Sequence, residues 1–220
     1  MPVEVDVFSG LDESKFQAKL ASARKAYEAA PKDPRLEAQV HAALLTEVAH
    51  IQDFAKANPD DEFAKANQHL LQAGTRSGPV AAAADALAVD TWHCGGSASL
   101  SGVVWWALGV TVMFPPPLSF AMGAKGGPDW SVAVFTSAIF GSFVVDPQSI
   151  FDSLPPNSGP LGGRKGPCKF QLGEISTGGA GAVRISFYST SGTYWGLLGG
   201  IAPGIGGSSI SGDGDMLWSG

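Results

Sequence analysis

The chain of 220 residues has few charged residues, few basic residues and little cysteine. Charged residues make up 15%, and 14 Lys and Arg stand against 20 Asp and Glu, which gives a formal net charge of −6. Nonspecific nucleic-acid binding needs clustered Lys and Arg, so the sequence predicts no nucleic-acid partner. The only cysteines are Cys94 and Cys168. We expect two inert buried thiols, with one disulfide as the alternative for an exported chain.

Long hydrophobic runs are also missing. The richest apolar stretch, "LSGVVWWALGVTVMF", is about 15 residues long and ends in "PPP", so it is short for a membrane-spanning helix. The first residues, "MPVEVDVFSGLDES", lack the basic and apolar regions of a signal peptide. We therefore expect a cytoplasmic protein, a mature form, or a protein secreted by a route that cleaves no N-terminal signal.

Glycine is scarce only in the first 90 residues, which hold three of the 29 glycines and most of the charge. This shift predicts two units, a helical region at 1–90 and a Gly-rich antiparallel β-barrel domain at 91–220. Apolar spacing of three and four residues predicts a helix from Asp12 or Ser14 to "PKDP" and a second from Pro34 to Asn58. A third is predicted from "PDDEF" to Gly74, followed by a junction at 75–91. We expect these helices to form a small antiparallel bundle or hairpin.

The second unit reads as all-β, which makes the fold class α+β. Val, Ile, Phe, Trp, Thr and Ser are concentrated between Gly, Pro, Asn and Asp. The predicted strands lie near 97–114, 118–124, 130–145, 168–176, 181–189, 193–201 and 207–218. Glycines within them favour the tight coiling of a small closed barrel. Several strands are apolar on both faces, so the outer face needs cover from the helices, from a second copy in a homodimer or from lipid.

The closing segment, "VRISFYSTSGTYWGLLGGIAPGIGGSSISGDGDMLWSG", carries a family resemblance. Its order of features is an apolar strand, a Ser/Gly turn, "GLLGG", a Gly/Ile/Ser stretch and alternating glycines that end in Trp. In this order it resembles the C-terminal strands of the virulence-associated protein (Vap) family of intracellular bacterial pathogens. The resemblance implies a compact eight-stranded barrel of two Greek-key motifs. It also implies a secreted, non-enzymatic role in host endolysosomal compartments, with membrane association as one proposal, and it supplies no active-site residues.

The helical N-terminal region and the missing signal peptide depart from the family pattern. Our leading hypothesis is nevertheless a non-enzymatic, toxin-like virulence effector that contacts a membrane lipid or a host protein. The candidate binding residues are aromatic or basic: Trp105, Trp106, Trp130, Tyr194, Trp195, Arg164, Lys165 and Lys169. We expect most of the aromatic rings to be core residues and the basic residues to lie in a solvated loop.

Two alternative functions remain open. One is a lectin-like or small-ligand-binding barrel with aromatic side chains and Asp or Asn exposed at one end. The other is a hydrolase that uses Cys94 and His93, although neighbouring residues on a strand point to opposite faces. No cofactor or metal is expected. Metal binding by His41, His50 and His69, or by Asp213 and Asp215, lacks a full ligand set.

Overall fold

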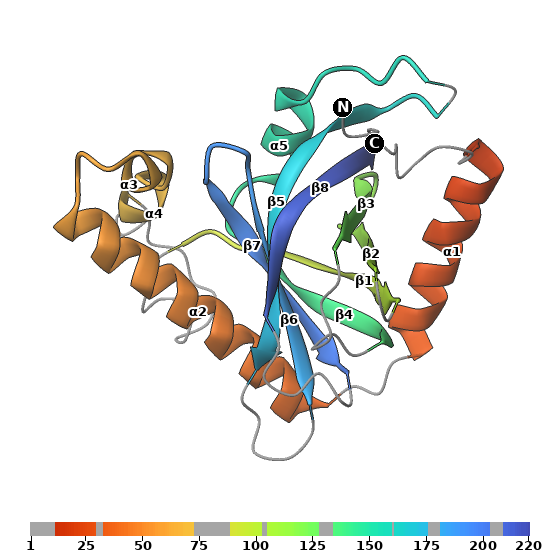
Figure 1. Cartoon of the computed structure of the whole chain (residues 1–220), viewed down its shortest axis with the longest axis horizontal. Helices are drawn as coiled ribbons and strands as arrows, with labels where there is room; N and C mark the ends of the chain where they lie inside the picture. Colours follow the sequence, from red (N-terminus) through yellow and green to blue (C-terminus); the bar gives the residue numbers. More distant parts are fainter. Residues whose placement is uncertain are drawn as a thin grey trace.

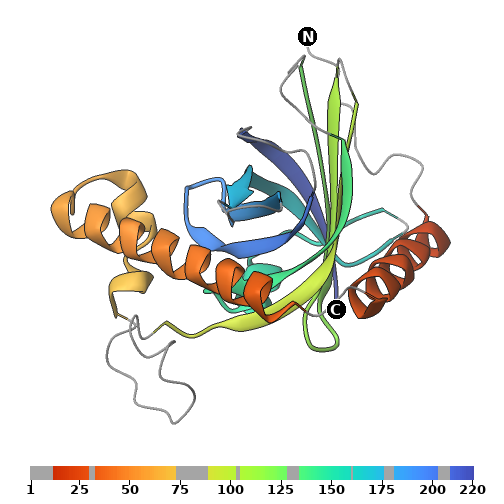
Figure 2. The same cartoon turned by 90° about the horizontal axis from the view of Figure 1, so that it is seen from below.

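The computed structural model describes residues 12–29, 33–72, 89–102, 105–127, 134–159, 161–175, 181–202 and 209–220. Within these residues the chain is α+β, with helices on the N-terminal side followed by a closed antiparallel barrel (Figures 1 and 2). The helices are α1 (Glu13–Ala29), α2 (Pro34–Ala57), α3 (Glu62–Ala66), α4 (His69–Gln72) and α5 (Pro147–Ser153). The strands are β1 (Trp92–Ser101), β2 (Trp106–Met113), β3 (Ser119–Gly126), β4 (Phe135–Phe143), β5 (Arg164–Ile175), β6 (Ala182–Tyr188), β7 (Tyr194–Ile201) and β8 (Ile210–Ser219).

The strand order confirms the predicted Greek-key barrel. Around the barrel the strands follow β1-β2-β3-β8-β5-β6-β7-β4. The fourth strand returns beside the first, and β8 returns beside β5, so each half has the order that defines a Greek key. All neighbouring strands are antiparallel, so β1, β3, β5 and β7 finish at one end of the barrel and the other four begin there.

Apolar side chains fill the barrel interior. The indole of Trp218 lies 4.8 Å from the ring of Phe120 and stacks on Phe114 at 5.8 Å, measured between centroids. These rings also contact Phe143 and Phe187. The interior is therefore a packed core, which disfavours storage of a small ligand inside the barrel.

The last strand follows the pattern that its sequence predicts. Ile210, Met216 and Trp218 are buried, whereas Ser211 and Asp213 on the opposite face are exposed. Leu217 is an outward-facing exception, because it packs under α1 with Phe16 and Ala121.

The two long helices cover the barrel and do not pack together as the predicted bundle, whereas α2 does contact α3 and α4, the two parts of the third predicted helix. Helix α1 packs on β1, β2 and β4, and α2 packs on β7 and β4, so the barrel separates them (Figures 1 and 2). The apolar stripe of α2, which includes Val40 and Leu44, shares a core cluster with Tyr194 and Leu197 of β7. The strands that are apolar on both faces need cover, so α1 and α2 pack against the barrel and not against each other. No helix in the described ranges is both long and apolar enough to cross a bilayer.

Glycine at the contact points allows this close approach. A Cβ built on Gly199 of β7 would lie 2.5 Å from Cγ2 of Val40, and one built on Gly95 of β1 would lie 2.2 Å from the ring of Tyr27. Real Cβ atoms do not approach so closely, so a larger residue at either position would displace Val40 or the ring of Tyr27.

The predicted strand at 97–114 is wrong as a single element, because β1 and β2 form a hairpin in this region. Gly102, with φ of 108°, begins the connection. Ser101-Gly102 is the turn signal in this segment, and the long apolar run that follows it hides the break between the two strands. The remaining predicted strands are confirmed within a few residues where they are described, except that β5 begins earlier, at Arg164. Residues 130–133, 176 and 207–208 of the predicted strands lie outside the described residues.

Two helical segments also differ from expectation. The third predicted helix is broken into α3 and α4, because the buried Asn67 side chain donates to the carbonyls of Phe63 and Gly192 and accepts from Tyr194 N–H. Helix α5 was not predicted, although Asp146 at its N-cap followed by Pro147 is a recognisable start signal. Most of the predicted junction at 75–91 lies outside the described residues.

Replacing Gly199 tests the helix contact. We expect Gly199→Ala to lower the free energy of unfolding by about 1–3 kcal/mol, because the new methyl group overlaps Val40. Gly109→Ala is the matched control, since its Cβ meets only Ser99 Oγ at 3.4 Å. Combining Gly199→Ala with Val40→Ala should cost less than the sum of the two single changes in urea unfolding. Equal stability of the two glycine variants would contradict the contact.

Candidate functional site

Three exposed apolar side chains lie at the same end of the barrel. Among the described residues, the large hydrophobic side chains exposed on the barrel are Trp105, Val134 and Ile201, with relative exposures of 69%, 59% and 40%. The strand directions place all three at the end where β1, β3, β5 and β7 finish. We call these three residues the apolar end. Clustered exposed apolar side chains are typical of surfaces that contact a membrane or a protein partner.

The structure separates the predicted aromatic candidates. Trp106 and Trp195 are buried in the barrel core, where Trp106 contacts Phe170 edge-on at 6.0 Å, and Tyr194 is buried under α2. Of the predicted aromatic residues, only Trp105 is both described and exposed. Trp130 lies outside the described residues.

The basic residues Arg164, Lys165 and Lys169 lie on β5, so their predicted loop is wrong. Pairing with β8 begins at Arg164, which lies opposite Trp218. Pro167 is tolerated in this part of β5 because β6 pairs with β5 only from Lys169 onward. The Arg164 guanidinium donates to Leu154 O at 2.6 Å and lies 5.5 Å from the centroid of the Phe151 ring. Arg164 therefore holds the segment around α5, and this explains its place without a ligand.

Cys94 and His93 are adjacent in sequence, but their side chains lie on opposite faces of β1. Cys94 is buried in the barrel core, where burial raises the pKa of its thiol. His93 is exposed, and its Nδ1 lies 2.8 Å from Ser142 Oγ. This arrangement does not bring a thiolate and its base together, as a cysteine hydrolase requires. Both cysteines are free thiols, and burial raises the pKa of Cys168 to about 12.

The candidate metal ligands remain dispersed. Asp213 and Asp215 lie on one face of β8, opposite Lys169 and Pro167 of β5. Within the described part of the chain, no three His, Cys, Asp or Glu side chains are grouped as metal ligands would be.

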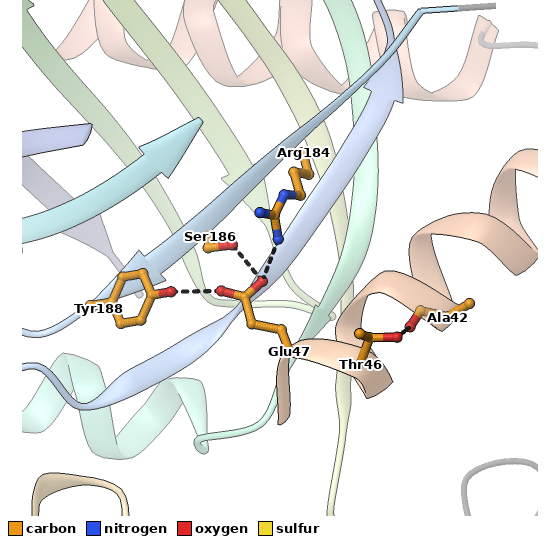
Figure 3. Close-up of polar contacts among 6 residues, drawn as sticks. All are labelled: Ala42, Thr46, Glu47, Arg184, Ser186 and Tyr188. Carbon is orange, nitrogen blue, oxygen red and sulfur yellow. Dashed lines mark hydrogen bonds and ion pairs between the residues drawn. The ribbon is translucent and has the colours of Figure 1, made fainter. Parts of the chain in front are cut away.

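A carboxylate that sequence analysis missed fastens α2 to the barrel (Figure 3). Glu47 Oε2 accepts from Arg184 Nη1 at 3.1 Å and from Ser186 Oγ at 2.9 Å, and Oε1 accepts from Tyr188 O–H at 2.6 Å. All three donors project from β6. Only 11% of the Glu47 side chain is exposed, so these bonds satisfy an otherwise costly buried charge.

The pKa values of two tyrosines near Glu47 are raised. Burial raises the pKa of Tyr188, and the negative charge of Glu47 adds to the shift. The same causes raise the pKa of Tyr194, whose buried hydroxyl has no hydrogen-bond partner in the described structure. One sequence signal could have identified Glu47 as a contact with the barrel. It is a charged residue within an apolar stripe, at helical spacing between Leu44 and Ile51.

Neutralising Glu47 should weaken the attachment of α2. We expect Glu47→Gln to lower the free energy of unfolding by about 1–3 kcal/mol, since Arg184 loses its counter-charge in a partly buried site. Thr46→Ala is the control on the same helix, because its hydroxyl bonds only to Ala42 O in its own helix. Thermal and urea unfolding of both variants would show the difference, and equal stabilities would disprove the fastening role.

The stability should also depend on His69. Burial lowers the pKa of His69 below its ordinary value of about 6.5, and its buried Nε2 has no hydrogen-bond partner among the described residues. The unfolded chain therefore takes up the proton more readily, so the contribution of His69 is present above about pH 6.5 and is lost as pH falls below it. His69→Gln should reduce the loss of stability between pH 7.5 and 5, measured by urea unfolding. The exposed His50→Gln control should retain that loss, and an unchanged pH profile in His69→Gln would contradict this assignment.

Comparisons with known proteins find a likeness to one solved structure. No family model and no curated protein matches the chain. The chain is similar to the virulence-associated protein VapB from the intracellular pathogen Rhodococcus equi at 18% identity and a TM-score of 0.37. The likeness covers 59% of this chain and 96% of that one. VapB carries the name of the family that the closing segment resembles, and at this TM-score the likeness supports no functional argument.

Proposed function

We propose that this protein is a non-enzymatic interaction protein that docks on a membrane surface through the apolar end of its barrel. The observation that carries the proposal is the joint exposure of Trp105, Val134 and Ile201. Tryptophan is enriched where membrane meets water, because its large ring is apolar and its N–H remains hydrated.

The energetics of this surface favour reversible docking. Burying the three exposed side chains in the headgroup region would contribute a few kcal/mol at about 25 cal/mol per Å² of apolar area. The net charge of −6 gives no general attraction to anionic lipid, so apolar contact has to supply the affinity. We therefore expect binding to zwitterionic vesicles that anionic lipid does not strengthen.

The alternatives fit the geometry less well. A cysteine hydrolase would need Cys94 and His93 in contact, and a ligand-storing barrel would need a hollow interior. We further propose a secreted, toxin-like role in virulence, because the closing segment resembles the Vap family. A host protein could occupy the same apolar end in place of lipid, and the vesicle experiment separates these two partners.

Co-sedimentation with phosphatidylcholine vesicles tests the proposal. We expect the full chain to sediment with the vesicles, and the Trp105→Ser, Val134→Ser double variant to lose most of this binding. Leu71→Ser is the matched control, because Leu71 is an exposed apolar residue of α4. Circular dichroism should show the same fold in all three proteins. Failure of the full chain to bind, or equal loss in the Leu71 variant, would disprove docking through the apolar end.

A further inference from the structure

A cleft of about 720 Å³ opens between the two long helices and the outer surface of the barrel. One wall is the C-terminal end of α1, with Tyr27 and Glu28, and the other is the N-terminal half of α2, with Glu37 and His41. The floor belongs to β1 and β4. The cleft lies near the start of β1 and the finish of β4, away from the apolar end, so it is independent of the membrane proposal.

The glycine contacts that dock the helices also form this cleft. Tyr27 rests over Gly95 and Val40 rests over Gly199, so each helix touches the barrel at its own point. Between these points the outward residues are Phe140 and Ser142 of β4 and His93 of β1. The register pairs His93 with Ser142 and Gly95 with Phe140, which makes these strands a continuous surface. The cleft is therefore fixed by packing on both sides.

Its lining is apolar at depth and acidic at the rim. Val40 and Leu44 are buried, and with Phe140 they form a hydrocarbon surface. Glu28 and Glu37 are exposed, one on each wall. Among the described residues that line the cleft there is neither lysine nor arginine. The local charge thus favours a positively charged group at the rim and disfavours a carboxylate or a phosphate.

Histidine and serine add directional polar contacts. Ser142 Oγ and His93 Nδ1 are 2.8 Å apart, and this bond orients the imidazole ring. The other ring nitrogen, Nε2, then donates or accepts according to the tautomer. His41 faces the same cleft from α2. A ligand with a hydrogen-bonding cationic head and an apolar body would match both parts of the lining.

We propose that this cleft binds an amphipathic amine, a molecule with a protonated amino group on a hydrocarbon body. The ammonium group lies between Glu28 and Glu37, and the hydrocarbon rests on Val40, Leu44 and Phe140. The volume lies in the range of sites that take small organic ligands, which is about 300–1,000 Å³. A bare metal ion fits less well, because no grouping of metal ligands occurs among the described residues and half of this lining is hydrocarbon.

Isothermal titration calorimetry of the full chain with n-dodecylammonium, below its micelle concentration, tests the proposal. n-Dodecanoate has the same hydrocarbon length and the opposite charge, so it serves as the ligand control. We expect saturable one-to-one binding of the amine and at least tenfold weaker binding of the carboxylate. Equal affinity for both would overturn the charge argument, and no binding of the amine would overturn the site.

Two sets of variants locate the bound amine. Glu28→Gln with Glu37→Gln should weaken binding about five- to tenfold, because water screens the attraction between each exposed carboxylate and the ammonium group. Ala38→Trp should abolish binding, since the exposed Ala38 lines the cleft. Ala42→Trp is the matched control, on an exposed turn of α2 that does not line it. Equal loss in the two tryptophan variants would place the amine elsewhere and contradict the assignment. Vesicle binding should be unchanged in all of them.

Discussion

Close contact between helix and barrel depends on glycine where the two surfaces meet. Gly199 leaves space for Val40, and Gly95 leaves space for the ring of Tyr27. The helices then cover apolar residues on the outer face of the barrel. Its inner face is a packed aromatic core, and part of its outer face is covered by α1 and α2. The helices thus act as an outer layer of the barrel.

The features with functional interest follow from how the helices cover the barrel. Glu47 bonds α2 to β6, and a space remains beside α2 on the side of α1. That space is the amphipathic cleft. The exposed Trp105 lies at the other end of the barrel. The cleft and the apolar end are therefore two separate surfaces, and a separate interaction is proposed for each.

The sequence predicts the fold well and the site only in part. Period-two alternation and interior glycines predict the barrel, and the stripe through Val40 and Leu44 predicts α2, because both are local patterns. The placement of α2 was not predictable, since it depends on Val40 meeting Gly199, which lies 159 residues away. For the same reason, aromatic character alone could not separate the exposed Trp105 from the buried Trp106. Asn67 breaks a helix through bonds to a distant hairpin, and no local rule contains that information.

Because α1 and α2 pack on the barrel, we expect the helices and the barrel to unfold as one cooperative unit. The two units at 1–90 and 91–220 that composition predicts would unfold separately. Native-state hydrogen exchange of the full chain distinguishes these two outcomes. Amides in the middle of α2, around Leu44 and Val48, should exchange only through the same global opening as those of β7. Their opening free energies should be equal and should fall together as denaturant is added. Exchange of α2 at a much lower opening free energy, while β7 stays protected, would contradict the claim.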